Sequence, residues 1–223
     1  MTFKLLCWNV EHFRGNDAER LARVVGHVQG QEPDVFALLE MEGANVRRLM
    51  EESFPTYDFF ITDGPEVQEI LVACRRGVFD QKAFVQKREF KEGNPALRPG
   101  ALLSVRQGPR WTNMLFLHTD SGVMAGDFGN RADMFERVWK LERALEKASK
   151  GDPRLLVIGD LNTMGMFFPT DRKADARVTA ELELRALSDA AKAAGMRVVP
   201  KDRPATWASS SSGLACDLDH VIA

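Results

Sequence analysis

The chain has 223 residues and a formal net charge of −2, and 44% of its residues are hydrophobic and 28% charged. A chain of this length and composition is expected to bury a sizeable apolar core, which excludes a disordered or fibrous protein. The slightly acidic balance argues against a protein that holds nucleic acid through a broad basic surface, although a bound divalent cation would add positive charge that this count omits.

The cysteines and the apolar runs bear on the cellular compartment. Cys7, Cys74 and Cys216 are odd in number and widely spaced, which is typical neither of a disulfide framework nor of a zinc site. Their pattern predicts a reducing environment. The amino-terminal residues turn polar too early for a signal peptide, and no apolar run approaches the ~18 residues of a membrane span. We therefore predict a cytoplasmic protein without a membrane span, of undetermined oligomeric state.

The first half of the chain predicts a strand, a helix and a second strand in succession. Residues 3–10 form a short apolar run. Asp17 is a candidate N-cap, and apolar residues between positions 21 and 28 recur at spacings that place them on one helix face. Residues 35–39 are continuously apolar, as in a strand that is buried on both faces. The remaining elements expected in this half are a short helix at 44–52 and strands at 57–61 and 70–74.

The second half continues the alternation of strands and helices. The expected elements are strands at 101–105, 114–118, 155–158 and 218–222, and helices at 132–148 and 180–194. Some strands are separated by helices and others follow one another, which favours a layered α/β fold with at least two sheet regions. No internal repeat and no long linker interrupts the chain, so a single domain over residues 1–223 is predicted.

Polar side chains stand where several of these apolar strands end, and strand ends are where a sheet presents chemistry to its loops. These residues are Asn9, Glu40, His118, Asp160, Asn162, Asp219 and His220. Carboxylate and amide oxygens suit Mg²⁺ or Mn²⁺, while the absence of a Cys/His cluster argues against zinc. A carboxylate can take a proton from water, and an amide or imidazole can donate to an oxygen on which charge builds. Together these groups can promote the attack of water on phosphorus.

The order of these motifs resembles that of the endonuclease/exonuclease/phosphatase superfamily. The motifs are Trp8-Asn9, Leu39-Glu40, His118 after an apolar run, and Gly159-Asp160-Leu161-Asn162. The resemblance covers nearly the whole chain and implies a DNase I-like fold, a four-layer α/β/β/α sandwich of two packed sheets flanked by helices. It implies Glu40 and Asn9 as ligands of Mg²⁺ or Mn²⁺. It also implies Asp160 as the group that activates water, with Asn162 and His118 as phosphate contacts.

The activity that the resemblance implies is metal-dependent hydrolysis of a phosphodiester, with nucleic acid as one candidate substrate. A phosphomonoesterase, or a phosphatase of phospholipids or inositol phosphates, would use the same site. A protein of another class is the remaining alternative: a catalytically inactive family member that binds a phosphorylated ligand or a partner protein.

Asp219-His220 departs from the family pattern. In the family, a Ser-Asp-His motif near the end supplies the last catalytic histidine, and Asp219 and His220 are candidates for this catalytic role. However, no Ser precedes Asp219, and the apolar frame of the pair resembles an earlier strand motif in which the Asp supports the catalytic histidine. We therefore expect the Ser-Asp-His motif and a closing strand to lie beyond Ala223, which would leave the strand at 218–222 with an exposed edge.

Each candidate also has a purely structural interpretation. Asn9 can simply end a strand, and Glu40 lies near a helix start, where the helix dipole favours a carboxylate. A lone histidine such as His118 is more often structural than functional. Asp160 and Asn162 both favour Asx-turns.

Five further residues have two interpretations. Arg98 and Arg131 can each clamp a phosphate with a bidentate guanidinium, or can be solvated surface residues. Phe167 and Phe168 can stack on a substrate base or pack in the core. Glu69 is either a support for a catalytic histidine or a surface charge.

Overall fold

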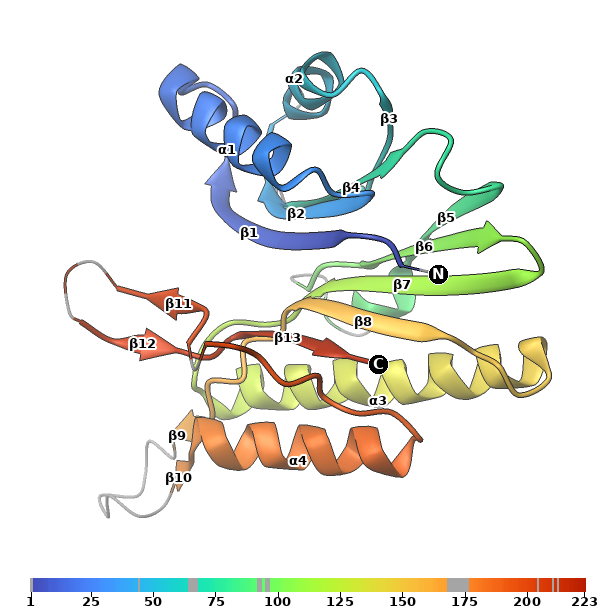
Figure 1. Ribbon diagram of the computed structural model, residues 1–223. Coiled ribbons are helices and arrows are strands. Elements are labelled where there is room, and N and C mark those ends of the chain that lie inside the picture. The colour runs from blue at the N-terminus through green and yellow to red at the C-terminus, as the bar shows by residue number, and fades with distance from the viewer. Residues whose placement is uncertain are drawn as a thin grey trace. The chain divides into compact units, whose positions relative to one another are not determined.

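The computed structural model describes residues 2–43, 45–63, 68–91, 94, 97–167, 177–203, 205–209, 211 and 213–223. The chain divides into two compact units, residues 1–117 and 118–223, and each unit contains both strands and helices (Figure 1). The single domain over the whole chain stays a prediction.

The first unit contains a four-stranded mixed sheet and an antiparallel run of three strands. Its elements are β1 (Leu5–Phe13), α1 (Ala18–Gln31), β2 (Val35–Met41), α2 (Val46–Ser53), β3 (Tyr57–Ile61), β4 (Glu69–Arg75), β5 (Gln81–Lys87), the 3-10 helix η1 (Arg88–Lys91), β6 (Gly100–Gln107) and β7 (Arg110–His118), whose last residue begins the second unit. The mixed sheet has the order β1-β2-β4-β3, with β1 and β2 parallel and the other neighbours antiparallel. β6 pairs antiparallel with both β5 and β7.

β2 is the buried centre of the first unit, as its continuous apolar run predicts. Every residue from Val35 to Leu39 is completely buried. Phe36 and Leu38 share one core cluster with buried residues of α1 and α2, and both helices cover this face of the sheet (Figure 1). α1 begins where predicted, because the Asp17 carboxylate accepts a hydrogen bond from the Arg20 N–H at 3.0 Å.

The two sheets of the first unit contact each other through β3 and β5. The rings of Phe60 and Phe84 stack with their centroids 5.1 Å apart, and Lys82 forms an ion pair with Asp58. β5 is absent from the sequence-based expectation. Its side chains are exposed or only partly buried, so it lacks the apolar run that marks β2.

The second unit combines two long helices with β8 and its antiparallel partner β13. Its elements are α3 (Ala125–Ser149), β8 (Leu155–Asp160), β9 (Met166–Phe167), β10 (Arg177–Val178), α4 (Ala180–Ala193), β11 (Trp207–Ala208), β12 (Ala215–Cys216) and β13 (Asp219–Ile222). α3 and α4 lie side by side (Figure 1). α3 begins at Ala125 rather than at residue 132, since the Asp127 carboxylate accepts from the Met124 N–H at 2.9 Å and caps the earlier start. The glycines at positions 126 and 129 hide this start in the sequence.

The exposed edge predicted for the last strand is wrong. The chain that follows α4 returns along β13 on the side away from β8. The N–H of Arg197 donates to the carbonyl of Ala223 at 2.8 Å, the N–H of Ala223 donates back at 2.9 Å, and Val199 donates to Val221 at 2.7 Å. This returning segment therefore covers the end of β13, from Val221 to Ala223, which does not offer a free edge for pairing with another chain.

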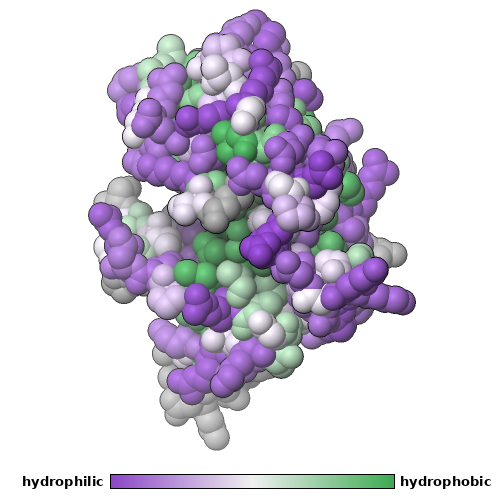
Figure 2. Space-filling model, turned by 45° about the vertical axis from the view of Figure 1, so that its right-hand side comes forward, coloured by the Kyte–Doolittle hydropathy of each residue, from purple (hydrophilic) through white to green (hydrophobic). Residues whose placement is uncertain are grey.

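Hydrophilic side chains make up most of the molecular face drawn in Figure 2, with hydrophobic side chains gathered in smaller patches. Among the described residues, the exposed large hydrophobic side chains are those of Trp8, Val85, Trp111, Met124, Phe167, Leu182, Trp207 and Leu214. In the part of the chain that the structure describes, no helix has the length and apolar character needed to cross a bilayer.

Candidate functional site

The structure brings Asn9 and Glu40 together at the carboxyl ends of β1 and β2. The two strands are parallel, with Asn9 opposite Leu39 in the register. Both strands therefore end at the same edge of the sheet. The Asn9 side-chain amide donates to Glu40 Oε1 at 2.8 Å, and the N–H of His12 donates to Glu40 Oε2 at 3.0 Å. Each carboxylate oxygen can accept a further contact. Glu40 is therefore oriented by two protein donors and keeps the capacity to bind a cation.

A histidine and a second glutamate next to Glu40 were not predicted. His12 Nδ1 lies 2.6 Å from Glu42 Oε1, and Arg14 Nε donates to Glu42 Oε2 at 2.6 Å. Burial raises the pKa of the Glu42 carboxyl, but the hydrogen bonds from His12 and Arg14 outweigh it and hold this pKa below its ordinary value. The Gln68 amide lies against the same imidazole, 2.8 Å from Nδ1. The Glu-x-Glu spacing at the end of β2 is the signal that sequence analysis could have used.

Glu69, at the start of β4, has a local partner. Its carboxylate accepts from the Thr62 hydroxyl at 2.5 Å, and this hydroxyl accepts in turn from the Ile70 N–H at 2.9 Å. These bonds join the ends of β3 and β4. They support the structural interpretation of Glu69.

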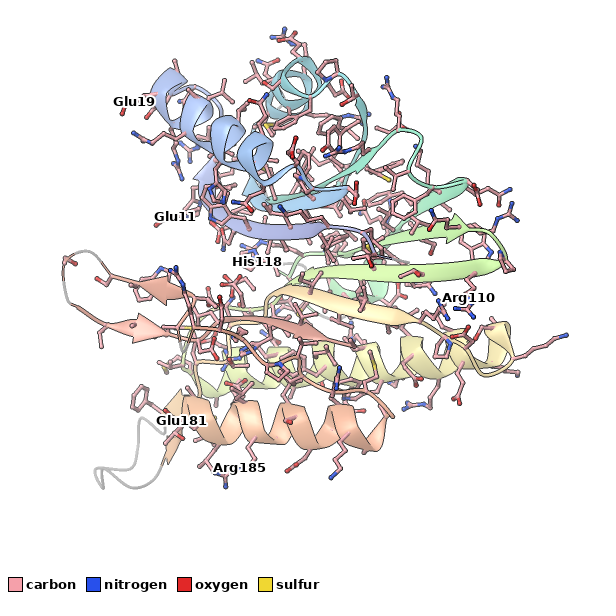
Figure 3. The ribbon with its side chains drawn as sticks, in the orientation of Figure 1. Glu11, Glu19, Arg110, His118, Glu181 and Arg185 are labelled. Atoms are coloured by element: carbon pink, nitrogen blue, oxygen red, sulfur yellow. The ribbon has the colours of Figure 1, made fainter. Side chains whose placement is uncertain are left out.

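His118, Asp160 and Asn162 form one buried cluster in the second unit, where Figure 3 marks His118 at the end of β7. His118 Nε2 lies 3.9 Å from Asp160 Oδ2. The Asn162 N–H donates to Asp160 Oδ1 at 3.2 Å, and the Asn162 amide donates to the Thr119 carbonyl at 3.1 Å. The Thr119 N–H donates to the Asp160 carbonyl at 3.0 Å. The turn that was predicted as the structural alternative is present, and it places Asp160 and Asn162 beside His118.

Asp219 lies directly opposite Asp160 in the antiparallel pairing of β13 with β8. Burial, together with the nearby charge of Asp160, raises the pKa of Asp219 to about 6. The strand pairing thus places two carboxyl groups close together, and the raised pKa of Asp219 brings its titration close to neutral pH. The supporting role of Asp219 toward a catalytic histidine stays a prediction.

His220 belongs to a different network, because successive side chains of a strand point to opposite faces of the sheet. Lys201 Nζ lies 3.2 Å from His220 Nδ1, and an ammonium can only donate. Nε2 therefore carries the proton and donates to the Thr163 hydroxyl at 2.8 Å, which donates to the Asp217 carbonyl at 2.9 Å. Burial, reinforced by the charge of Lys201, lowers the pKa of His220 to about 4. The structure thus holds His220 as a neutral, buried histidine, and its catalytic role stays a prediction.

The opposite pKa shifts of Asp219 and His220 predict opposite pH dependences of stability. Asp219 has a folded pKa above its ordinary value of 3.8, so its contribution is present below about pH 4 and is lost as pH rises through about 6. His220 has a folded pKa below its ordinary value of 6.5, so its contribution to stability increases as pH rises over about the same range. At about 1.4 kcal/mol per pKa unit, each effect is on the order of 2–3 kcal/mol.

Asp219→Asn is expected to stabilise the protein at pH 7 by about 2–3 kcal/mol and to have little effect at pH 4. Urea unfolding from pH 4 to pH 7 in the presence of EDTA measures the difference from the wild type. Asp189→Asn, at an exposed position of α4, is the matched control. A difference that does not change with pH would contradict the assignment.

Arg131 is completely buried and does not face solvent. Its Nε and Nη2 donate to Glu183 at 2.8 and 3.1 Å, while Nη1 and Nη2 also donate to the carbonyls of Gly122 and Gly165 at 2.7 and 2.8 Å. A further bond runs from Nη1 to the Asp120 carbonyl at 3.3 Å. The guanidinium has only five N–H donors, so the structure replaces the predicted phosphate-binding role with that of a buried link between α3 and α4.

The other candidates have simpler outcomes. Arg98 is partly buried in the first unit, just before β6, and its phosphate-binding role stays a prediction. Phe167 is half exposed on β9, which does not support the core alternative, whereas Phe168 lies outside the described residues.

The donor set at Glu40 and Asn9 fits a hard divalent cation. Within the described ranges, no group of three or more His, Cys, Asp or Glu side chains could hold a metal ion by itself. Mg²⁺ is commonly held by one or two carboxylates, with water and substrate phosphate oxygens filling the remaining positions. A glutamate with a neighbouring amide oxygen suits this kind of binding better than it suits a closed structural site.

Residues 6–223 match the sequence profile of the Endonuclease/Exonuclease/phosphatase family. Truncated TDP2 of Caenorhabditis elegans has a TM-score of 0.67 at 16% identity, over 99% of this chain and 83% of that chain. D. rerio TDP2 complexed with single strand DNA product has a TM-score of 0.65 at 17% identity, over 99% of this chain and 82% of that chain. The human Nocturnin catalytic domain with bound sulfate anion has a TM-score of 0.65 at 12% identity, over 99% of this chain and 80% of that chain. A search of curated proteins gave no significant match.

The predicted DNase I-like α/β fold is confirmed by these structural matches. Identities of this size carry the fold and not the activity of the matched proteins. What the chain does must therefore be argued from its own side chains.

Proposed function

Since the chain belongs to the endonuclease/exonuclease/phosphatase family, we propose that it is a Mg²⁺- or Mn²⁺-dependent hydrolase of phosphodiester bonds. The observation that carries the proposal is the buried cluster of His118, Asp160 and Asn162. Burial of three polar side chains costs free energy, and the fold does not require this burial. Buried polar clusters of this kind are typical of catalytic sites. The single strand DNA product bound to D. rerio TDP2 supports a nuclease-like substrate.

In this proposal Asp160, Asn162 and His118 supply the general base and the phosphate contacts. Asp160 takes the proton of the attacking water. Asn162 uses one amide hydrogen for the Thr119 carbonyl, and its second amide hydrogen donates to a phosphoryl oxygen. His118 donates to another phosphoryl oxygen, on which charge builds as water attacks. Asp219, beside Asp160, supports this arrangement.

Glu40 and Asn9 supply the cation site of the proposal. Glu40 is the main ligand, with Asn9 beside it as both its hydrogen-bond donor and a source of an amide oxygen. Glu40 and Asn9 would hold the cation, which would supply positive charge to offset the charge that develops on the phosphate and the leaving oxygen. The three free cysteines support the reducing, cytoplasmic environment that the sequence predicts.

Hydrolysis of bis(4-nitrophenyl) phosphate is expected to depend on Mn²⁺ or Mg²⁺. EDTA should abolish turnover, and added metal should restore it, because Glu40 is the cation ligand of the proposal. Parallel assays with 4-nitrophenyl phosphate and a single-stranded oligonucleotide separate a monoesterase from a diesterase and a nuclease.

Faster hydrolysis of the monoester would contradict the phosphodiesterase assignment. Turnover that persists in EDTA would contradict the metal dependence. Saturable binding of the oligonucleotide without any hydrolysis would favour the catalytically inactive alternative.

A further inference from the structure

The backbone around Glu40 adopts strained conformations on both strands. Asn9 pairs with Leu39 and Phe13 pairs with Met41, so Val10, Glu11 and His12 lie opposite Glu40 alone. Glu11 and His12 both have φ of 49°, and Glu40 has φ of 61°. Each non-glycine residue in this left-handed region costs on the order of 1 kcal/mol or more, so the surrounding contacts must hold the bulge in place. Figure 3 shows Glu11 at this turned end of β1.

Two sets of contacts hold the bulge. From α1, Arg20 Nη2 donates to the carbonyl of Val10 at 2.5 Å and also to the carbonyl of Glu11. From the end of β2, Glu42 binds the His12 ring. Arg20 fixes the backbone oxygens of the bulge, while Glu42 fixes its one aromatic side chain.

The bond between His12 and Glu42 has a defined direction. Glu42 is only 4% exposed, and its carboxylate, bound to Arg14 on the other oxygen, can only accept. In the 2.6 Å contact the proton therefore lies on His12 Nδ1, and the Gln68 amide nitrogen, itself a donor 2.8 Å from Nδ1, makes no hydrogen bond to that atom. The imidazole is anchored at one end although more than half of the His12 side chain is exposed.

This anchor is coupled to the Glu40 carboxylate through the backbone of His12. The N–H of this residue donates to Glu40 Oε2 at 3.0 Å, and the ring Nε2 lies 3.7 Å from the same oxygen. Loss of the contact with Glu42 would release the His12 end of the strained bulge. A change in the φ of His12 would then turn this N–H and remove one of the two donors that orient Glu40. Contacts of this kind behind a metal ligand commonly change metal affinity by about 10- to 100-fold.

We propose that Glu42 is a positioning residue that acts through His12 to hold Glu40 in its cation-binding orientation. The inference rests on the proposed function, because it takes Glu40 as the cation ligand. It adds Glu42 and His12 to the residues that hold the cation site in shape.

Calorimetric titration of the full chain with Mn²⁺ tests the proposal without any assay of activity. Glu42→Gln keeps the size of the side chain but removes its charge, and the dissociation constant for Mn²⁺ is expected to rise about 10- to 100-fold. His12→Ala, at a mostly exposed side chain, is expected to give a similar loss and to fold normally. Glu19→Gln is the matched control, since Glu19 forms an exposed ion pair with Arg23 on the surface of α1.

The double variant Glu42→Gln/His12→Ala distinguishes positioning from general damage to the fold. If Glu42 acts through His12, the double variant binds Mn²⁺ about as weakly as either single variant. Losses that multiply in the double variant would overturn the proposal, as would unchanged affinity in Glu42→Gln. Wild-type protein that does not bind Mn²⁺ would overturn the cation site itself, and the proposed function with it.

Discussion

Asp160→Ala is expected to lower kcat for phosphodiester hydrolysis by about 10²- to 10⁴-fold, the usual contribution of a positioned general base. The side chain of Asp160 is buried beside His118 and Asn162, and no other carboxylate of the cluster occupies the same place in the turn. The fold should persist, because removal of Asp160 also relieves its repulsion with Asp219. Steady-state kinetics with saturating Mn²⁺ measures the loss, and circular dichroism verifies the fold.

The control for this experiment is Asp189→Ala, at an exposed position on α4, which should leave kcat unchanged. The same relief of repulsion gives a second readout, since the pKa of Asp219 should fall in Asp160→Ala. Turnover of the variant within about tenfold of the wild type would remove Asp160 from the catalytic role, because a general base contributes more than this.

Glu183→Ala is expected to lower the free energy of unfolding by about 3–5 kcal/mol, the usual cost of removing one partner of a buried ion pair. Glu183 is 5% exposed, and it binds both Arg131 and the N–H of Gly165. The variant would leave the Arg131 charge buried without its counter-ion and the Gly165 N–H without its acceptor. Urea unfolding followed by circular dichroism measures the change.

Two comparisons make this prediction specific. Glu52→Ala removes the exposed ion pair with Arg48 on α2 and should cost less than about 1 kcal/mol. The double variant Arg131→Met/Glu183→Leu should be less destabilised than Glu183→Ala, since apolar replacement of both partners removes the buried charge. A loss below about 1 kcal/mol in Glu183→Ala would show that the pair is not essential to the fold.

The local features of the chain follow from local sequence. The apolar run at 35–39 forms β2 because such a run is stable only when buried. Asp17 begins α1 because its carboxylate satisfies a free helix N–H. The Gly159-Asp160-Leu161-Asn162 sequence forms its turn because Asp160 can accept from a backbone N–H two residues later. Each of these depends on residues close together in the chain, so the sequence alone suffices to predict them.

The candidate site was predictable only in part, because the order of motifs does not say which side chains meet. The sequence identified Asn9 with Glu40, and Asp160 with Asn162, and the structure brings each pair together. It did not identify His12 or Glu42 as a pair. The bond between them depends on a bulge in β1, and the spacing of residues in the sequence does not predict this bulge. The role of the site in catalysis stays a prediction that the variants above test.

The sequence by itself determined the fold class, the helix and strand cores, and the residue types available at the strand ends. Only the tertiary structure decided which of two adjacent residues, Asp219 or His220, lies beside Asp160, because the strand register sets which face each side chain occupies. Only the tertiary structure placed Arg131 in the interior, because a charge can be buried only where a distant residue, here Glu183, supplies the opposite charge. Register and long-range partners are set by packing of the whole chain, and no local pattern contains them.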